Sequence, residues 1–306
     1  MSELKTGIVL QARSGWHKVQ DGDEVVICLV RGKLKRERLY TTLIATGDQV
    51  RWRLTRPGKG VIEEVLPRER RLSRLQPGPG QVAIEDVIVA NPEQVVLIFS
   101  VREPVPHLRM LDRLLVIAEH NDLPAILCVN KIDLLDAEKA VEEAHQLFGV
   151  YEEVGYPVLY ASAHTGQGVK ELSKQLVGRL SVLSGPSGVG KSSLLNAIQP
   201  ELGLAVREVS EATGKGRHAT VGVQLWPLEG GGYVADTPGL REAGFFDIAP
   251  EELAWHFVEM RPYLSDCRFS SCTHTHEPDC AVKAAVEAGD IREVRYDSYC
   301  QMLQRA

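Results

Sequence analysis

The feature of this chain that most limits its fold is the order of two short sequence motifs. The segment "SGPSGVGKSSLLN" occupies residues 184–196, whereas "NKID" occupies residues 130–133. In guanine-nucleotide-binding domains the glycine-rich loop opens the fold and the Asn-Lys-x-Asp motif nearly closes it. The reverse order requires that the ordinary ends of the domain be joined and the chain opened elsewhere, which domains tolerate because their termini often lie close together. The sequence therefore predicts a circularly permuted domain.

The glycine-rich loop matches the pattern G-x-x-x-x-G-K-[S/T] in full, between the apolar run "LSVLS" and a segment with helical periodicity. Backbone N–H groups of such a loop surround phosphates at a helix N-terminus, the lysine reaches the β- and γ-phosphates, and the hydroxyl binds Mg²⁺. We therefore expect Lys191 to be a catalytic residue that contacts the β- and γ-phosphates, and Ser192 to bind Mg²⁺. The residues expected to surround the phosphates are Gly185, Pro186, Ser187, Gly188, Val189, Gly190, Lys191, Ser192 and Ser193.

The "NKID" motif follows the strand-like run "PAILCV" and indicates which base is bound. The Asp133 carboxylate can accept hydrogen bonds from both N1–H and the exocyclic amine of guanine, whereas adenine has no such donor pair. A polar group left unpaired against the wrong base is worth about 10⁴-fold in discrimination, so the motif favours GTP over ATP. Asn130 and Lys131 complete this motif, and Ser162 and Ala163 in "SAHTG" are expected to enclose the base.

The segment "DTPG" at residues 236–239 follows the strand-like "GGYVA" and has the position of a second switch. Asp236 is expected to face Mg²⁺, and the amide of Gly239 the γ-phosphate. In the permuted order this switch continues directly into the C-terminal part of the chain. The nucleotide state can therefore be transmitted to that part.

The first switch is expected between residues 206 and 221, in "GKGRHATV". Thr220 is the candidate Mg²⁺ ligand, and His218 is a candidate for positioning the attacking water, with contact to phosphate or RNA as the alternative. Leu240 stands after "DTPG", where many GTPases have a glutamine that orients this water. We therefore expect slow intrinsic hydrolysis.

The N-terminal part of the chain reads as a small basic β-barrel. Short β-rich segments occur between residues 6 and 66, and residues 1–75 contain 16 Lys and Arg against 9 Asp and Glu, although the whole chain has a net charge of −6. This pattern is typical of an oligonucleotide-binding (OB) barrel, and a barrel of the SH3 kind would read similarly. The basic stretch 31–38 predicts contact with a polyanion, a solvated surface being the alternative. The segment 75–81 predicts a linker.

Beyond this linker, apolar strands alternate with amphipathic helical segments, which predicts a parallel sheet with helices on both faces. The fold class expected for the whole chain is thus multidomain α/β: an N-terminal OB-fold β-barrel, a circularly permuted P-loop GTPase domain and a C-terminal, mainly helical zinc-binding domain. The longest apolar runs, such as residues 95–99, are too short to span a membrane, and the charged start lacks a signal peptide. A cytoplasmic protein without membrane contact is expected.

A cysteine and histidine cluster near the C-terminus predicts a metal site. Its pattern is C-x₄-C-x-H-x₅-C, which gives four soft ligands within fourteen residues, the set of a closed structural zinc site. His276 is a rival ligand, and free thiols beside a surface histidine pair are the alternative. One structural zinc ion per chain is expected, with Mg²⁺ entering with GTP. The proposed zinc ligands are Cys267, Cys272, His274 and Cys280.

The permuted order, together with "GPSGVGKSSLLN", "GRHAT", "DTPG" followed by Leu, and "CRFSSCTHTHEPDCAV", resembles the small-ribosomal-subunit-dependent GTPase A family (RsgA, also called YjeQ) over nearly the whole chain. The resemblance implies an RNA-binding OB domain at 1–74, a permuted GTPase domain at 75–245 and a zinc-binding domain at 246–306. It also implies a late assembly factor of the small ribosomal subunit that binds rRNA, and a catalytic histidine matching His218. The family usually has a run of threonines after this histidine, whereas Ala219 and Val221 flank Thr220 here.

Two other functions compete with a subunit-stimulated, monomeric GTPase that cycles between GTP and GDP. One is a permuted GTPase of large-subunit assembly, against which the barrel and the Cys/His cluster argue. The other is a non-hydrolysing RNA-binding switch in which GTP only tunes affinity. A measurable rate of single-turnover hydrolysis on bound small subunits would exclude the non-hydrolysing switch.

Overall fold

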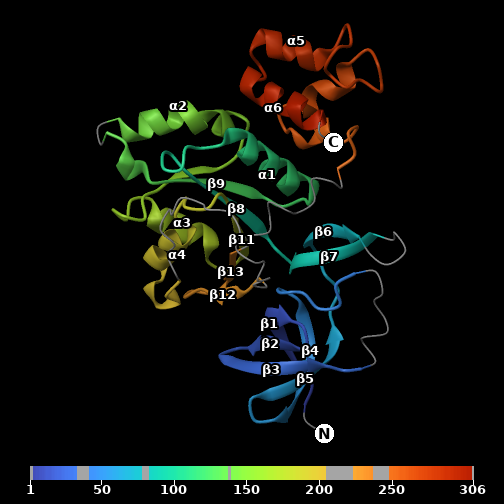
Figure 1. Cartoon of the computed structure of the whole chain (residues 1–306), viewed down its shortest axis with the longest axis vertical. Coiled ribbons are helices and arrows are strands. Elements are labelled where there is room, and N and C mark those ends of the chain that lie inside the picture. Colours follow the sequence, from blue (N-terminus) through green and yellow to red (C-terminus); the bar gives the residue numbers. More distant parts are fainter. Residues whose placement is uncertain are drawn as a thin grey trace.

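The computed structural model describes residues 3–32, 41–77, 83–136, 139–204, 223–236 and 248–304. Figure 1 shows the N-terminal barrel at one end of the long axis, the large sheet with its helices in the middle, and the helical C-terminal part at the other end. Within the described ranges, no helix is long and apolar enough to cross a bilayer.

The N-terminal strands form a closed barrel in the order β1-β2-β3-β5-β4, with β1 pairing to β4 to complete it. The pairing of β3 with β5 is parallel, whereas the other pairs are antiparallel. This Greek-key arrangement is that of an OB barrel, and it decides between the two barrel types that the sequence left open. The strands are β1 Lys5–Arg13, β2 Trp16–Asp21, β3 Glu24–Val30, β4 Gln49–Arg56 and β5 Lys59–Val65.

The interior of this barrel is filled by alternating apolar side chains around Trp52, which is fully buried. Gly60 is needed because a Cβ there would lie 2.8 Å from both the Cys28 sulfur and the Trp52 ring. Such a side chain would displace the central aromatic ring. The barrel core is therefore tightly packed, which leaves its outer surface for ligand contact.

A two-stranded antiparallel hairpin, β6 Arg71–Pro77 with β7 Ala83–Ala90, lies between the barrel and the large sheet (Figure 1). Residues 75–77 of the predicted linker are therefore paired strand, a pairing that local composition did not reveal. Upstream of β6, the guanidinium of Arg68 donates to the fully buried Asp48 carboxylate at 2.7 and 2.8 Å. These contacts fix the barrel against the segment that follows it.

The large sheet has the strand order β10-β9-β8-β11-β13-β12, with parallel pairing except between β12 and β13. Several strands are buried along their whole length, as expected for a sheet that is covered on both faces. The strands are β8 Gln94–Ser100, β9 Ala125–Asn130, β10 Val158–Tyr160, β11 Leu180–Ser184, β12 Leu225–Pro227 and β13 Tyr233–Asp236.

Alternate residues of β8 face two separate apolar clusters, because successive side chains of a strand point to opposite faces. Leu97 packs in the cluster of α1 Leu108–His120 and α2 Ala140–Glu153, whereas Val96 packs in that of α3 Val169–Leu176 and α4 Lys191–Ile198. The predicted parallel sheet with helices on both faces is confirmed.

The chain joins α3 to β11 through residues 177–179, which is where the ends of an unpermuted domain would be. Gly178 donates from its backbone N–H to the carbonyl of Gly231 at 3.0 Å. Gly232 packs so closely that a Cβ would lie 2.6 Å from the nitrogen of Arg179. The join is thus short and held against the turn between β12 and β13.

The C-terminal part contains two 3-10 helices, η6 Leu253–His256 and η7 Arg261–Asp266, and two α-helices, α5 Ala281–Ala288 and α6 Glu293–Leu303. Phe257 and Tyr299 are fully buried and pack edge to face with ring centroids 5.6 Å apart. Val116 of α1 belongs to the same apolar cluster. The C-terminal part therefore packs directly on the helix layer of the large sheet.

Candidate functional site

The nucleotide motifs meet at one edge of the large sheet. The phosphate loop follows β11, Asn130 ends β9, Ser162 follows β10, and Asp236 ends β13. These strands are parallel, so their carboxyl ends lie at the same edge, which is where open α/β sheets bind ligands. The fold thus brings together motifs that lie far apart in the sequence, from Asn130 to Asp236.

Two glycines of the phosphate loop have positive φ angles and close neighbours. Gly185 has φ 147° and a Cβ would lie 2.0 Å from the carbonyl oxygen of Ile98 in β8. Gly190 has φ 93°, and a Cβ would lie 2.4 Å from the amide nitrogen of Asn130. A side chain at Gly185 would collide with backbone and one at Gly190 with the Asn130 side chain, and both positive φ angles favour glycine. The glycine spacing therefore reflects steric requirements at both ends of the loop.

The residues that follow the loop form the first turn of α4. The Lys191 ammonium donates to the carbonyl oxygens of Gly185 and Pro186, each at 3.0 Å, so the side chain folds back over the loop. Ser192 and Ser193 follow in the same turn. The N-terminus of a helix presents unpaired N–H groups and a positive dipole end, which suit a phosphate.

Asp236 lies beside the phosphate loop, because β13 pairs with β11 and places it opposite Leu183. Burial raises the pKa of the Asp236 carboxyl, and the nearby Lys191 charge acts in the opposite direction. A carboxylate that loses water at this edge gains from a cation beside it. The arrangement fits the predicted role at Mg²⁺.

Asn130 physically connects the base motif to the phosphate loop. Its amide nitrogen donates to the carbonyl oxygen of Val189 at 2.8 Å, and its amide oxygen accepts from the backbone N–H of Ala163 at 3.2 Å. The side chain is 1% exposed. The sequence assigned Asn130 to nucleotide contact, and this linking role was missed because it depends on the spatial order of three strands.

The base-reading carboxylate is held by the neighbouring loop. The Ser162 hydroxyl donates to Asp133 and accepts from the backbone N–H of Thr165 at 3.0 Å. Lys131 has φ 64° and its ammonium donates to the carbonyl oxygen of Glu103, so its stem lies along the edge of the site. The Asp133 side chain remains exposed and can meet a ligand.

Four of the residues predicted from the switch segments, His218, Thr220, Gly239 and Leu240, lie outside the described residues, which end at 204 and 236 and resume at 223 and 248. The basic residues 33–38 of the barrel also fall outside them. Their predicted roles therefore stay predictions.

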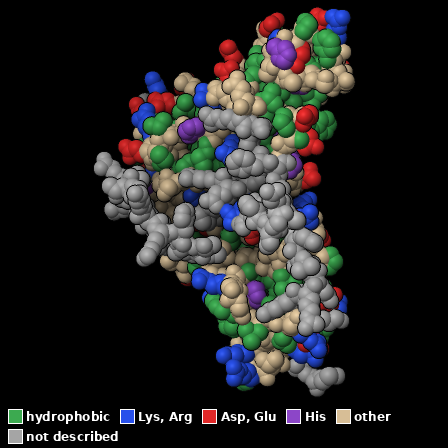
Figure 2. All heavy atoms as spheres, turned by 45° about the vertical axis from the view of Figure 1, so that its right-hand side comes forward, with side chains coloured by type: hydrophobic (Ala, Val, Ile, Leu, Met, Phe, Trp, Pro, Cys, Tyr) green, Lys and Arg blue, Asp and Glu red, His purple; other side chains and the backbone are tan. Residues whose placement is uncertain are grey.

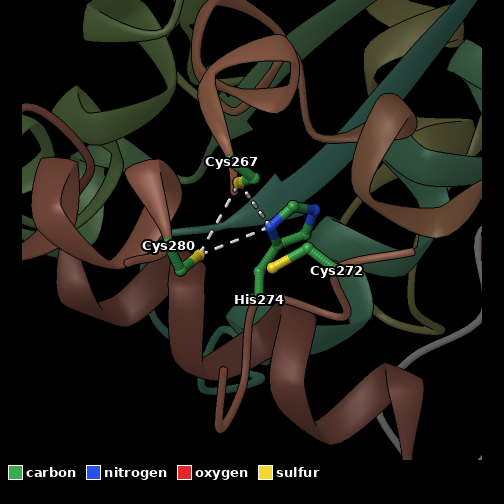
Figure 3. A group of neighbouring side chains, drawn as sticks. All are labelled: Cys267, Cys272, His274 and Cys280. Atoms are coloured by element: carbon green, nitrogen blue, oxygen red, sulfur yellow. Dashed lines mark hydrogen bonds between the residues drawn. The ribbon is translucent and has the colours of Figure 1, made fainter. Parts of the chain in front are cut away.

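The Cys/His cluster is assembled in the C-terminal part, as Figure 3 shows. Ligand atoms of Cys267, Cys272, His274 and Cys280 all lie within 4.8 Å of one another. His274 Nδ1 is 3.4 Å from the Cys267 sulfur and 3.5 Å from the Cys280 sulfur, and these two sulfurs are 3.9 Å apart. The four side chains therefore converge on one point.

These separations fit a tetrahedral zinc ion. With Zn–S of about 2.3 Å and Zn–N of about 2.0 Å, the edges of the tetrahedron are about 3.8 Å between sulfurs and about 3.5 Å between sulfur and nitrogen. The rival His276 is 83% exposed and lies against Glu277, and it is not part of the converging group. The donor set thus favours His274 over His276.

The loop that carries His274 is fixed by two tyrosines of α6, which donate hydrogen bonds to it, and by the carboxylate of Glu277, which accepts them. Tyr296 donates to the carbonyl oxygen of His274 at 2.6 Å, and Tyr299 donates to that of Thr273 at 2.7 Å. Glu277 accepts from the backbone N–H of Thr273 at 2.7 Å. The sequence pattern did not predict that Glu277 fixes this loop, although its position as an acidic residue between two ligands was the available signal.

Comparison with known proteins agrees with this site. A family model described as RsgA GTPase matches residues 65–246, and one described as RsgA N-terminal domain matches residues 6–62. A protein of Gemmatimonas aurantiaca named small ribosomal subunit biogenesis GTPase RsgA is 45% identical over 99% of this chain and 97% of its own length. A protein of the same name from Moorella thermoacetica is 44% identical over 97% and 96%.

Solved structures give the same result. The crystal structure of YjeQ from Thermotoga maritima has a TM-score of 0.80 and 37% identity, covering 99% of this chain and 98% of the other. The crystal structure of YloQ, a circularly permuted GTPase, has a TM-score of 0.75 and 32% identity, covering 99% of this chain and 95% of the other.

A permuted parallel sheet with a phosphate loop, a guanine motif and an acidic strand end beside that loop defines a circularly permuted GTPase, an enzyme that hydrolyses GTP. The family matches span most of the chain, and the curated relatives match it from end to end. The chain belongs to the RsgA GTPase family.

Proposed function

We propose that this GTPase acts in biogenesis of the small ribosomal subunit, the role for which its relatives are named. The observation that carries the nucleotide part is the double hydrogen bond of Asn130, which joins the phosphate loop to the base loop. Binding of the phosphates by one loop is thereby coupled to the position of the loop that binds the base.

In the proposed hydrolysis of GTP, the phosphate loop and Lys191 bind the β- and γ-phosphates, while Asp133 selects guanine. Ser192 and Thr220 would hold the Mg²⁺ that accompanies GTP and neutralises phosphate charge, and Asp236, whose strand pairs with the strand before the loop, would hold its water shell. His218 orients the attacking water in place of the glutamine that Leu240 replaces. The backbone N–H of Gly239 contacts the γ-phosphate.

The Cys₃His cluster binds one zinc ion per chain as a structural element. Its converging ligands and the tyrosine hydrogen bonds to its loop support this assignment. The four side chains would fill all the positions of a tetrahedral zinc ion, so the ion would supply folding energy and no open position for a substrate.

The barrel is proposed to bind rRNA. Among its described cations, Arg13, Lys18, Arg56 and Lys59 form no ion pair with the rest of the described chain, whereas Arg31, Arg51 and Arg53 pair with glutamates. Figure 2 shows Lys and Arg side chains over this end of the molecule. Unpaired cations gain most from neutralising phosphates.

The proposal includes a monomer that divides into an RNA-binding domain at 1–74, a GTPase domain at 75–245 and a zinc-binding domain at 246–306. Phosphate release in a single turnover, measured with and without purified small subunits, tests the function. We expect strong stimulation by small subunits and none by large subunits. Stimulation by large subunits alone would favour the large-subunit function, and binding without any turnover would favour the non-hydrolysing switch.

A further inference from the structure

A second group of side chains with metal-binding atoms lies where the C-terminal part meets α1. His120 is the last residue of α1, Glu252 directly precedes η6, and His256 ends η6. One ligand atom of each lies within 4.8 Å of the other two. This group shares no residue with the Cys₃His cluster, and the nucleotide site does not use it.

The geometry of the two histidines suits a shared ion. His120 Nδ1 and His256 Nε2 are 3.3 Å apart, with the rings almost perpendicular at 87°. Two nitrogens at about 2.0–2.1 Å from one tetrahedral zinc ion are separated by about 3.3–3.4 Å. The measured separation therefore equals that of two ligands on one metal.

His256 is held in a buried position beside His120. The residue is 8% exposed, and its other ring nitrogen, Nδ1, is buried without a hydrogen-bond partner among the described residues. Because a neutral imidazole that binds a metal through Nε2 has its proton on Nδ1, this buried atom takes no part in ligation through Nε2.

The surroundings carry negative charge that attracts a cation. A cavity of about 680 Å³ adjoins the group and is lined by Asp122, Glu251 and Glu252 among others. The one arginine in its lining, Arg261, donates to Glu119 at 2.7 Å and is thereby neutralised. His120 also lies in the last turn of α1, where the helix dipole favours positive charge.

We propose that His120, Glu252 and His256 bind a second divalent transition-metal ion, with zinc as the natural occupant, and leave one coordination position open to the cavity. Two imidazoles and one carboxylate form a ligand set that zinc uses in sites with an open position, and imidazole is a poor ligand for Mg²⁺ or Ca²⁺. The ion links α1 of the GTPase sheet to η6 of the C-terminal part. Because Glu252 is exposed and only three side chains ligate, this ion exchanges more readily than the one bound by three cysteines.

Zinc counting on the full-length protein tests this site. After equilibrium dialysis against micromolar zinc, the wild-type chain should hold two ions, and a brief wash with chelator should leave one. His120→Ala and Glu252→Gln should each hold one ion before and after the wash. His145→Ala removes a half-exposed histidine of α2 that pairs with Glu152, so this matched control should hold two. Retention of one ion after the wash shows that a variant's C-terminal part is folded.

Cobalt replacement identifies the ligands of each ion. The first Co²⁺ equivalent should produce thiolate-to-cobalt charge-transfer absorption, and the second should add visible ligand-field bands without further thiolate absorption. These second bands should disappear in His120→Ala and Glu252→Gln. A wild-type chain that saturates with one ion overturns the proposal, and so does a second equivalent that both variants retain, since the ion would then lie elsewhere.

Discussion

The guanidinium of Arg295 in α6 donates to the carboxylate of Asp112 in α1, and both side chains are only 1% exposed. Arg295 also donates to Glu259 at 2.6 Å, and Asp112 accepts from the Tyr151 hydroxyl at 2.8 Å. The Ser298 hydroxyl donates to the remaining Asp112 oxygen. This satisfied buried network holds the C-terminal part to the GTPase sheet.

Removal of one partner from this network should destabilise the protein strongly. Asp112→Ala leaves the Arg295 charge buried beside a single carboxylate, and losing one partner of a buried pair costs about 3–5 kcal/mol. We expect a loss of this size in the free energy of unfolding, measured by urea denaturation with tryptophan fluorescence.

The matched control for Asp112 is Glu153→Ala, which breaks the exposed pair with Arg292, whose N–O distance is 2.7 Å. Surface pairs contribute about 0–1 kcal/mol. Equal effects of the two substitutions would show that the buried pair does not hold the two parts together.

Base selection should depend on Asp133. Asp133→Asn replaces an acceptor that meets both guanine donors with an amide, so GTP affinity should fall and xanthosine triphosphate, which has a carbonyl in place of the amine, should bind instead. Fluorescent nucleotide titration measures both affinities. Lys170→Ala, which changes an exposed charge on α3, is the control. An unchanged preference for guanine would remove Asp133 from the base site.

Subunit-stimulated hydrolysis should depend on His218. Activating groups of this kind contribute about 10³–10⁵ in rate, so His218→Ala should lose most of the stimulated rate while GTP affinity changes little. Thr220→Ala should differ by weakening the Mg²⁺·GTP complex as well. Stopped-flow nucleotide binding beside single-turnover hydrolysis on saturating subunits distinguishes them. Full stimulation of His218→Ala would mean that the subunit supplies the catalytic group.

Zinc at the Cys₃His cluster should be necessary for the C-terminal fold. In small structural sites the binding free energy is of order 10 kcal/mol and acts as folding energy. Cys272→Ala with Cys280→Ala should therefore abolish the ion that survives a chelator wash and should unfold residues 250–304 locally, as hydrogen exchange would report. Cys300→Ala, which alters a thiol outside the cluster, should keep this ion. Elemental analysis without any retained zinc in the wild type would refute the assignment.

Subunit binding should depend on the unpaired cations of the barrel. Replacing Arg56 and Lys59 with alanine should weaken binding and reduce the slope of log affinity against log salt by about one for each lost phosphate contact. Arg51→Ala with Arg53→Ala, which removes cations already paired with glutamates, should change the slope less. An unaltered slope in the Arg56 and Lys59 variant would mean that other residues contact the RNA, and the predicted stretch 31–38 would be the next candidate.

Local chemistry at short spacing was readable without a structure. Three motifs require particular side chains within a few residues of one another: Gly185 to Ser192, Asn130 to Asp133 and Cys267 to Cys280. The order of the first two along the chain predicted the permuted fold. The alternation of apolar strands and amphipathic helices predicted the covered parallel sheet, since side-chain periodicity reflects the faces that are buried.

Only the tertiary structure decided which distant residues meet. The parallel pairing of β3 with β5 made the barrel an OB barrel, and the neighbouring strand ends brought Asn130 to Val189. The joining of α1 to the C-terminal part placed Asp112 against Arg295 and His120 against His256. Such pairs leave no local pattern, because their contact energy arises only after long stretches of chain have packed and closed the loops between them.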